Sequence, residues 1–247
     1  MTATRRATDT FLIVLVLLML WQGLHEIAGA TALPAPLPTM TYLLHTLASP
    51  QFAVNAAATL QAFALALALA GALGLAIGVW MGAHHLSGAV GEPILVALYS
   101  LPKITLYPVV LLAFGLGVSG KVVFGAMHGT LPVALLTMGA IRAIPGVYLR
   151  AARTLHLSPW QTLTTVLLPA ALPEVFTGLR IGFTATLLGV LLGEMFASKA
   201  GLGYMLMNAM SLAQSEEMVT VAIILFAFAA MANAFLLWLE HRLHWRV

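Results

Sequence analysis

The chain has 247 residues, of which 61% are hydrophobic and only 8% are charged, and its formal net charge is +3. Soluble domains carry roughly 25% charged residues, and their helices need a polar face, so this composition excludes an ordinary soluble fold. The sequence contains no cysteine, which excludes disulfide bonds and thiolate metal sites.

Six apolar segments follow one another along the chain, and a membrane-spanning helix needs about 20 such residues. Because backbone groups in hydrocarbon must be hydrogen-bonded within the segment, each is expected to be a helix. The sequence therefore predicts a single-domain, all-α integral membrane protein with about six transmembrane helices. They are expected at 10–28, 55–83, 93–117, 122–141, 173–197 and 218–240, and a more polar stretch, the 143–172 loop, separates the fourth from the fifth.

The first segment admits two interpretations. Arg5 and Arg6 precede the apolar run 11–20, and Ala28-Gly29-Ala30 resembles a signal-peptidase site, as in a cleaved signal peptide. The polar residues between the run and that site favour a retained membrane helix instead. In both interpretations the chain emerges outside the cell, so the topology of the later segments is the same.

The second and third segments carry signals of helix geometry. Gly74, Gly78 and Gly82 recur at every fourth position, which lets another helix approach closely. We interpret this stripe as part of the bundle core rather than as a subunit interface. Pro102 and Pro108 interrupt the hydrogen-bond ladder of the third segment and are expected to kink it.

The stretch from Gly115 to Lys121 matches two nucleotide-binding patterns, GxGxxG and GxxxxGK. A membrane helix rather than a strand precedes it, and Val122 stands where a P-loop needs Ser or Thr to hold magnesium. We interpret the stretch as an outer turn between two helices. No ATP or Mg²⁺ site remains in the chain, so it is not expected to be an enzyme, and its paired histidines lack further ligands for a metal.

Two ionisable residues, Lys103 and Glu194, lie inside the apolar segments. A charge that faces lipid at mid-depth costs about 2.5–3.5 kcal/mol on insertion scales. Both side chains are therefore expected inside the bundle. For Glu194 a structural role is favoured over contact with a substrate.

The cations predict the orientation. With the N-terminus inside, eight arginines fall on inner loops and chain ends, whereas the outer loops (29–54, 118–121 and 198–217) carry only Lys121 and Lys199. This asymmetry follows the positive-inside rule, so both termini and the 143–172 loop are expected in the cytoplasm. The cations form no patch, so no nucleic-acid partner is expected despite a sequence pI near 9.5.

The 143–172 loop has the pattern of two short helices joined by a turn. Good helix formers fill 147–155, Ser158 is a strong N-cap, Pro159 suits the first helical position and Gln161 completes a capping box. The second helix is expected to end near Pro169. The apolar residues at the turn form a knob that favours a docking site, although a helix lying on the membrane surface is the alternative.

The spacing in this loop resembles the EAA loop of permeases from binding-protein-dependent ABC importers: Glu-Ala-Ala, three residues, Gly, nine residues, an aliphatic residue, one residue and Leu-Pro. Ala151-Ala152, Val166 and Leu168-Pro169 match. Arg150 and His156 depart from the pattern, because they stand where the family has Glu and Gly. The glycine position corresponds to a left-handed helix end, which His adopts at some cost.

Shorter matches extend the resemblance from about residue 34 to 242 and bring the chain nearest to the nitrate/sulfonate/taurine group. They are Ser100-Leu101-Pro102-Lys103, Phe114-Gly115-Leu116-Gly117, Gly178-Leu179-Arg180, Glu194 and Gly201-Leu202-Gly203-Tyr204. The resemblance implies a type I (MetI-like) permease bundle in the bacterial inner membrane, with a cytoplasmic coupling helix pair.

The resemblance also implies the partners: an ABC ATPase subunit that binds ATP and Mg²⁺, an extracytoplasmic solute-binding protein, a second permease copy in a homodimer, and membrane lipid. It implies a small solute as cargo, such as nitrate, an alkanesulfonate or taurine, bicarbonate, or a thiamine pyrimidine precursor. A secondary transporter is the alternative, and an adjacent ATPase gene would distinguish the two. The residues expected to couple to the ATPase are Arg150, Ala151, Ala152, Arg153, Leu155, His156, Leu157, Pro159, Trp160, Leu168 and Pro169.

Overall fold

The computed structural model describes the backbone of residues 3–244 and, within that range, the side chains of 8–10, 12–240 and 242. Regular structure in this part of the chain is helical throughout, without strands. Five of its helices are long and apolar enough to cross a membrane, or six if one bent pair counts as a single span, which confirms the expected all-α membrane fold. In chain order the elements are α1 (Ala3–Ala28), α2 (Pro36–Leu47), α3 (Pro50–Ala83), α4 (His85–Ser100), η1 (Lys103–Leu106), α5 (Tyr107–Phe114), α6 (Val118–Arg142), α7 (Gly146–Thr154), α8 (Pro159–Thr162), η2 (Leu163–Leu167), α9 (Leu168–Ala197), α10 (Leu202–Ser211) and α11 (Ser215–His244).

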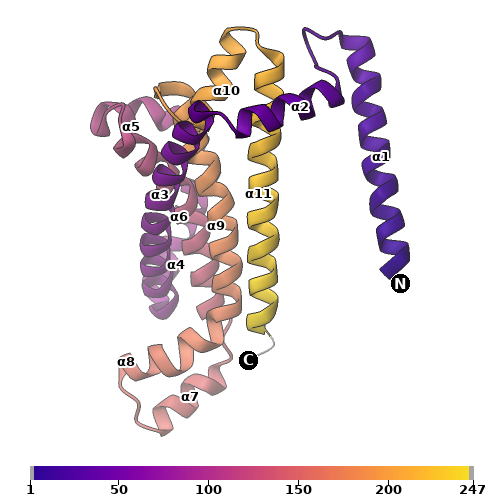
Figure 1. Ribbon diagram of the computed structural model, residues 1–247. Coiled ribbons are helices and arrows are strands. Elements are labelled where there is room, and N and C mark those ends of the chain that lie inside the picture. The colour runs from indigo at the N-terminus through magenta and orange to yellow at the C-terminus, as the bar shows by residue number, and fades with distance from the viewer. Residues whose placement is uncertain (1–2, 245–247) are drawn as a thin grey trace.

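The centre of the bundle consists of α3, α6 and α9, with α11 packed against α9 (Figure 1). The glycine stripe of α3 lies at the contact between α3 and α6. A Cβ atom at Gly74 would overlap Val133, one at Gly78 would overlap Thr137, and Gly82 meets the next turn of α6 in the same way. The interpretation of this stripe as bundle core is therefore confirmed.

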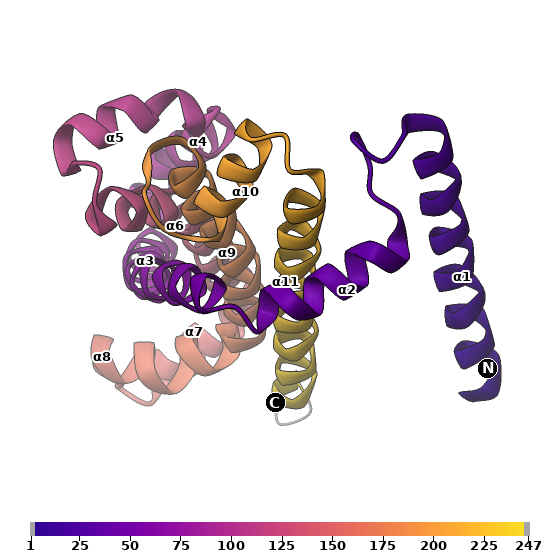
Figure 2. The same cartoon turned by 45° about the horizontal axis from the view of Figure 1, so that its top comes forward.

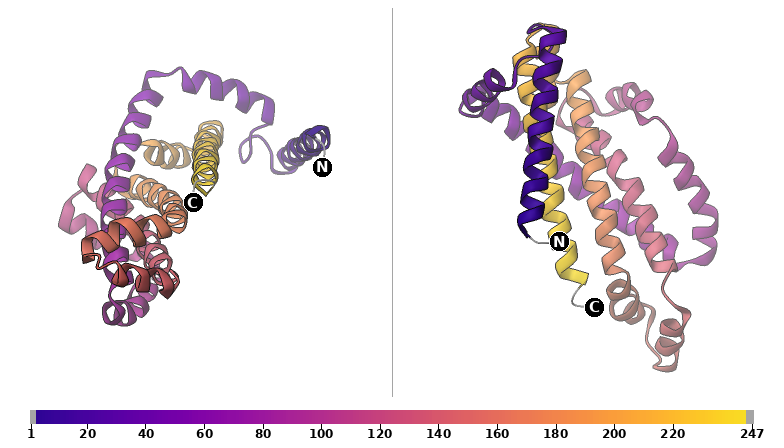
Figure 3. Two further views of the ribbon diagram at one scale, coloured as in Figure 1. Left: turned by 90° about the horizontal axis from the view of Figure 1, so that it is seen from below. Right: turned by 90° about the vertical axis from the view of Figure 1, so that its right-hand side faces the viewer.

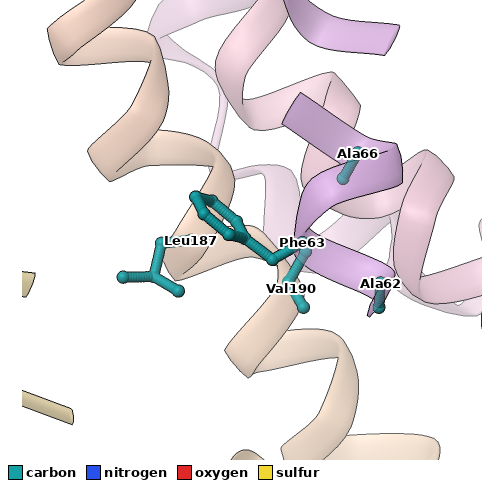
Figure 4. Close-up of a cluster of buried hydrophobic side chains, with 5 residues drawn as sticks. All are labelled: Ala62, Phe63, Ala66, Leu187 and Val190. Carbon is teal, nitrogen blue, oxygen red and sulfur yellow. The ribbon is translucent and has the colours of Figure 1, made fainter. Parts of the chain in front are cut away.

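Hydrophobic side chains join α3 to α9 in the middle of the bundle. The cluster consists of Ala62, Phe63 and Ala66 on α3 and Leu187 and Val190 on α9 (Figure 4). Lipid tails are as apolar as these side chains, so removal from water does not drive their association in a bilayer. Close packing and the many small dispersion contacts that it brings hold the two helices together.

The third apolar segment, expected at 93–117, is broken rather than continuous. α4 begins earlier, at His85, and ends at Ser100; the chain resumes as η1 and α5, and the two halves are bent by 87°. Pro102 supplies no backbone N–H, and it forces the preceding residue out of the helical region, so Leu101 is extended with φ −65° and ψ 138°. The expected kink is thus a full break.

The connections at the end opposite the 143–172 loop contain more helix than expected. α2 occupies part of the expected loop 29–54, and α10 occupies part of 198–217 (Figure 1). The expected loop 118–121 is wrong, because α6 begins at Val118 and the turn lies just before it, where Gly115 has φ 77°. Lys121 is therefore no loop cation: it sits in the first turn of α6, and its side chain is buried.

The first helix stands apart from the bundle. α2 runs sideways from the top of α3 and carries α1 to a position beyond α11 (Figures 2 and 3). Among the described residues it contacts chiefly α2 and the intervening turn, where the Trp21 indole N–H donates to the carbonyl of Pro34 over 3.0 Å. None of its most apolar window is buried.

Candidate functional site

The 143–172 loop projects beyond the bundle as two short helices, α7 and α8 (Figure 1). The first ends as its sequence predicted. His156 has φ 52°. Its N–H donates to the carbonyl of Arg153 over 3.0 Å, and the N–H of Leu157 donates to the carbonyl of Ala152 over 3.1 Å. These are the two bonds of a Schellman motif, with His156 at the left-handed position that usually holds glycine. The turn therefore has a defined shape.

The second helix begins with the predicted capping box. The N–H of Gln161 donates to Ser158 Oγ over 3.2 Å, and the N–H of Ser158 donates to Gln161 Oε1 over 2.9 Å. Two orphan donors of the helix start are thereby satisfied. The expected end of this helix near Pro169 is wrong, because α8, the π-helical turn η2 and α9 form one continuous helical run from Pro159 to Ala197.

Pro169 accounts for the irregular turn. A proline inside a helix removes the hydrogen bond to the carbonyl four residues earlier and clashes with it. Here Pro169 lies at the start of α9, directly after the π turn Leu163–Leu167. A single π turn widens the helix locally. The loop thus connects rigidly to the fifth span instead of ending at a flexible joint.

The knob of the loop is exposed. Leu155 and Trp160 each expose 70% of their surface, whereas Leu157 is half-buried and Ala152 is buried. The remaining predicted coupling residues, Arg150, Ala151, Arg153, His156, Pro159, Leu168 and Pro169, are exposed. The structure thus places all of them on one protruding element, with Ala152 as packing beneath it.

The base of the loop is packed against the bundle. Leu149 and Leu163 of the loop lie against a buried cluster that combines the ends of α6 and α9. That cluster consists of Ala140, Ile141, Leu167, Ala171 and Val175. A displacement of the knob would therefore be transmitted directly to the two central helices.

Glu194 is completely buried, as expected, and its partner Lys121 was not predicted from the sequence. Lys121 Nζ lies 3.5 Å from Glu194 Oε1 and donates to the carbonyl of Ala200 over 2.7 Å. Glu194 Oε2 accepts hydrogen bonds from Thr59 Oγ1 over 2.8 Å and from the N–H of Gly203 over 3.0 Å. One carboxylate therefore joins α3, α6, α9 and the start of α10.

The same network fixes the turn before α10. The N–H of Gly201 donates to Asn55 Oδ1, and that of Leu202 donates to Thr59 Oγ1, each over 2.8 Å. Gly201 has φ 124°, and a Cβ atom there would overlap the carboxyl group of Glu194. All these polar groups belong to the protein itself, so the geometry favours the structural role expected for Glu194.

Lys103 has a different environment. It begins η1 at the break of the third segment, is half-buried, and donates from Nζ to the carbonyl of Tyr99 over 3.0 Å. Its ammonium group also lies 5.0 Å from the centre of the Tyr99 ring. The expectation that Lys103 lies within the bundle is met only in part, because it lines an open cavity beside α6.

Two further ion pairs, which were not predicted from the sequence, brace the half of the bundle next to the 143–172 loop. Arg180 on α9 pairs with Glu240 on α11 over 3.1 Å. Arg142 at the end of α6 pairs with Glu92 on α4. Each pair joins helices that are distant in sequence, so spacing alone gives no signal of it.

Within the described residues, no group of three or more His, Cys, Asp or Glu side chains could hold a metal ion. The buried network around Glu194 joins several helices of the bundle, and a structured element projects from one end of it. Such an arrangement is that of a helical membrane protein with a structured element outside its spans.

The comparisons with known proteins give the family. The model of the binding-protein-dependent transport system inner membrane component matches residues 72–246. The chain belongs to this family and is the membrane-spanning permease subunit of an ABC transport system. This decides against the secondary transporter.

Curated relatives cover nearly the whole chain. A "Probable ABC transporter permease protein" of Haemophilus influenzae is 31% identical, over 98% of this chain and 99% of the relative. The taurine transport system permease protein of Escherichia coli is 30% identical, over 83% of this chain and 78% of its own. Relatives at 25% to 28% identity are named for aliphatic sulfonates, nitrate and bicarbonate, and one named for riboflavin matches 45% of this chain.

Solved structures share the fold. A chain of the inward-facing MetNI methionine ABC transporter superposes with a TM-score of 0.67 at 19% identity, over 75% of this chain and 93% of that one. This match shows the expected MetI-like bundle.

Proposed function

We propose that two copies of this chain form the translocation path of an importer for a small anion, with a separate ATPase docked on the 143–172 loop. In this proposal ATP and Mg²⁺ are bound by the ATPase, and an extracytoplasmic solute-binding protein delivers the cargo. The observation that carries the proposal is the protruding knob formed by Leu155 and Trp160, each 70% exposed on a loop with fixed turns.

The knob suits a protein partner. Large apolar side chains on the tip of a polar loop are costly in water and become favourable in a pocket, and tryptophan is enriched among residues that dominate binding energy. The Schellman turn at His156 and the capping box at Ser158 hold the tip in one shape. Little conformational entropy is then lost on docking.

Orientation follows from the cations. The 143–172 loop carries Arg150 and Arg153, and α11 ends on the same side of the bundle as this loop (Figure 1). By the positive-inside rule this side is cytoplasmic, in a bacterial inner membrane, with both termini inside. The turn around Gly201 and α10 then face the binding protein.

The first helix supports a second permease copy. The span Thr8–Ala28 within α1 is apolar overall, yet none of its most apolar window is buried within its own chain. The lateral α2 holds it away from the bundle (Figure 2). A symmetric homodimer would let each α1 pack against the bundle of the partner, while lipid covers the remaining apolar surface.

The cargo class rests on the relatives. Aliphatic sulfonates, nitrate and bicarbonate carry negative charge at neutral pH, and taurine carries a sulfonate group. The competing cargo is a flavin or a thiamine precursor. The binding protein encoded beside this permease can be purified and its bound ligand identified by mass spectrometry, which would decide between these cargo classes. An uncharged heterocycle would contradict the proposal of an anionic cargo.

Crosslinking tests the docking. The chain has no natural cysteine, so Leu155→Cys or Trp160→Cys introduces a single thiol. Either should crosslink to a cysteine placed in the membrane-facing groove of the ATPase, and the half-buried Leu157→Cys should react more weakly. Leu86→Cys is the matched control, because Leu86 is 77% exposed on the same side of the bundle. Crosslinks from Leu86 alone would contradict the proposal.

A further inference from the structure

A cavity lies where the third segment breaks. Its volume is about 300 Å³, and α3, the α4–η1 junction and α6 line it. Thr130, one of its lining residues, stands halfway along α6 (Val118–Arg142), so the cavity reaches the middle of the membrane. Non-helical backbone at such depth is tolerated only where it is buried in protein or lines a water-filled space. The extended Leu101 lines this cavity.

Lys103 lines this cavity and carries a positive charge that no carboxylate compensates. Within the described membrane spans, every other lysine or arginine pairs with a carboxylate, as the pairs Lys121–Glu194, Arg142–Glu92 and Arg180–Glu240 show. Lys103 has only the carbonyl and ring of Tyr99. Its ammonium group has three N–H donors, and one of them is used.

Thr130 provides a second, independent feature. It is buried, it lines the same cavity, and its hydroxyl group has no hydrogen-bond partner in the protein. The other walls are apolar, with Leu73 on α3, Leu98 on α4 and Met127 on α6. A buried hydroxyl without a partner costs about 1–3 kcal/mol, which a ligand that bonds to it would recover.

We propose that this cavity is an anion-binding stage of the translocation path, with Lys103 as its selectivity residue and Thr130 as a hydrogen-bond donor to the passing anion. The inference rests on the proposed import of small anions and names the residues that would favour them. The low-dielectric walls let a single ammonium charge act over the whole cavity. Rings of lysine or arginine serve anion pores in the same way.

The competing explanation is local: Lys103 would merely cap the last carbonyls of α4. A positive charge at a helix C-terminus is favourable in its own right. Capping requires neither water in the cavity nor an effect of Lys103 on uptake. Entry of water-soluble ions into the cavity, together with the effect of Lys103 on uptake, therefore separates the two explanations.

Thiol labelling measures the entry of ions and the electrostatic potential in the cavity without knowledge of the cargo. We place the only cysteine at Met127→Cys in the transporter assembled with its ATPase, and compare the labelling rates of a methanethiosulfonate reagent bearing a sulfonate with one bearing a trimethylammonium group. Lys103→Gln should lower the ratio of anionic to cationic rate by about tenfold, as Coulomb's law gives for one charge at close range. Lys103→Arg should preserve the ratio.

Leu212→Cys serves as the reference position, because Leu212 is 59% exposed outside the spans, and its ratio should not respond to Lys103→Gln. An unchanged ratio at Met127→Cys would overturn the inference. So would the absence of labelling at Met127→Cys when Leu212→Cys reacts, because the cavity would then be dry.

Uptake into proteoliposomes distinguishes this inference from the proposed function. Taurine and nitrate are the probes. If the unaltered transporter takes up neither, the proposed anion import fails, whatever the labelling ratio. If it takes up either, Lys103→Gln should reduce uptake about tenfold and Thr130→Val by a smaller factor, while the exposed Lys199→Gln has no effect. Full uptake by Lys103→Gln would overturn the role of Lys103.

Discussion

Two residues without the freedom of glycine end helices in the left-handed region. His156 has φ 52° and Ala213 has φ 54°. At Ala213 the bonds repeat the Schellman pattern, because its N–H donates to Met210 and the N–H of Gln214 donates to Ala209. The sequence predicted the left-handed conformation of His156, because His156 stands at the glycine position of the EAA-loop spacing. No motif spacing marks Ala213 in this way.

Glycine should relieve this strain at both positions. The left-handed penalty is about 1–2 kcal/mol, so His156→Gly and Ala213→Gly should each stabilise the purified permease by about 1 kcal/mol. His156→Val should destabilise it, because a β-branched residue disfavours positive φ. Melting temperatures in detergent measure all three variants.

A specific contact between His156 and the ATPase predicts something else: His156→Gly would uncouple ATP hydrolysis from transport and leave the melting temperature unchanged. Ala213→Gly lies at the other end of the bundle and serves as the control. A lower melting temperature for His156→Gly would refute the helix-end explanation.

The buried pair of Lys121 and Glu194 should be essential for assembly. Removing one member of a buried ion pair costs about 3–5 kcal/mol, because the other charge is left without compensation. Glu194→Gln should therefore lower the melting temperature by on the order of 10 °C while substrate selectivity is retained. Altered selectivity with normal assembly would instead make Glu194 a substrate contact.

Removing both charges tests the pairing itself. The double variant Lys121→Met with Glu194→Gln should be more stable than Lys121→Met alone, in which a bare carboxylate remains. Strict additivity of the two single losses of stability would mean that the residues do not interact.

The energetic cost of a lipid-facing charge was enough to place Glu194 inside the bundle from the sequence alone. It could not identify Lys121, because the partner is set by how α6 packs on α9.

At the scale of elements, hydropathy located the spans well but not their interruptions. All six apolar segments correspond to helices or to the bent pair. A window of apolar residues cannot show that Pro102 breaks the third span, because the direction after the break depends on packing around Tyr107, whose hydroxyl donates to the carbonyl of Gly193. The short helices α2 and α10 were not predicted, because helices that do not span the membrane lack the long apolar run by which the spans were located.

The contact between α3 and α6 leads to a test with a matched pair of glycines. A Cβ atom at Gly78 would overlap Thr137 and the carbonyl of Ala134, whereas one at Gly71 would make an ordinary contact of 3.8 Å with Leu179. Gly78→Ala should thus destabilise the permease by about 1–3 kcal/mol through overpacking. Gly71→Ala should be neutral or stabilising by up to about 1 kcal/mol. Melting temperatures compare the two, and equal effects would contradict close packing of α3 on α6.

At the scale of the whole molecule, a packed body carries two appendages. The body is α3, α6, α9 and their close neighbours, braced by three ion pairs between helices. The appendages are the 143–172 loop and the arm formed by α1 and α2 (Figure 3). Both present apolar surface that their own chain does not cover. We therefore expect the body to be stable alone, and we propose that each appendage gains further contacts from a partner.

The arm gives the last prediction. Deleting residues 1–30 removes α1, none of whose most apolar window is buried in its own chain, so the melting temperature of the bundle should change by less than about 4 °C, the shift that about 1 kcal/mol produces. The proposed homodimer should weaken strongly, because stable interfaces bury on the order of 1,200–2,000 Å² and α1 would supply much of that area. Light scattering during size-exclusion chromatography gives the mass of both forms. A truncated chain that stays fully dimeric would show that α1 packs on lipid alone, and a truncated chain that no longer folds would show that the bundle depends on it.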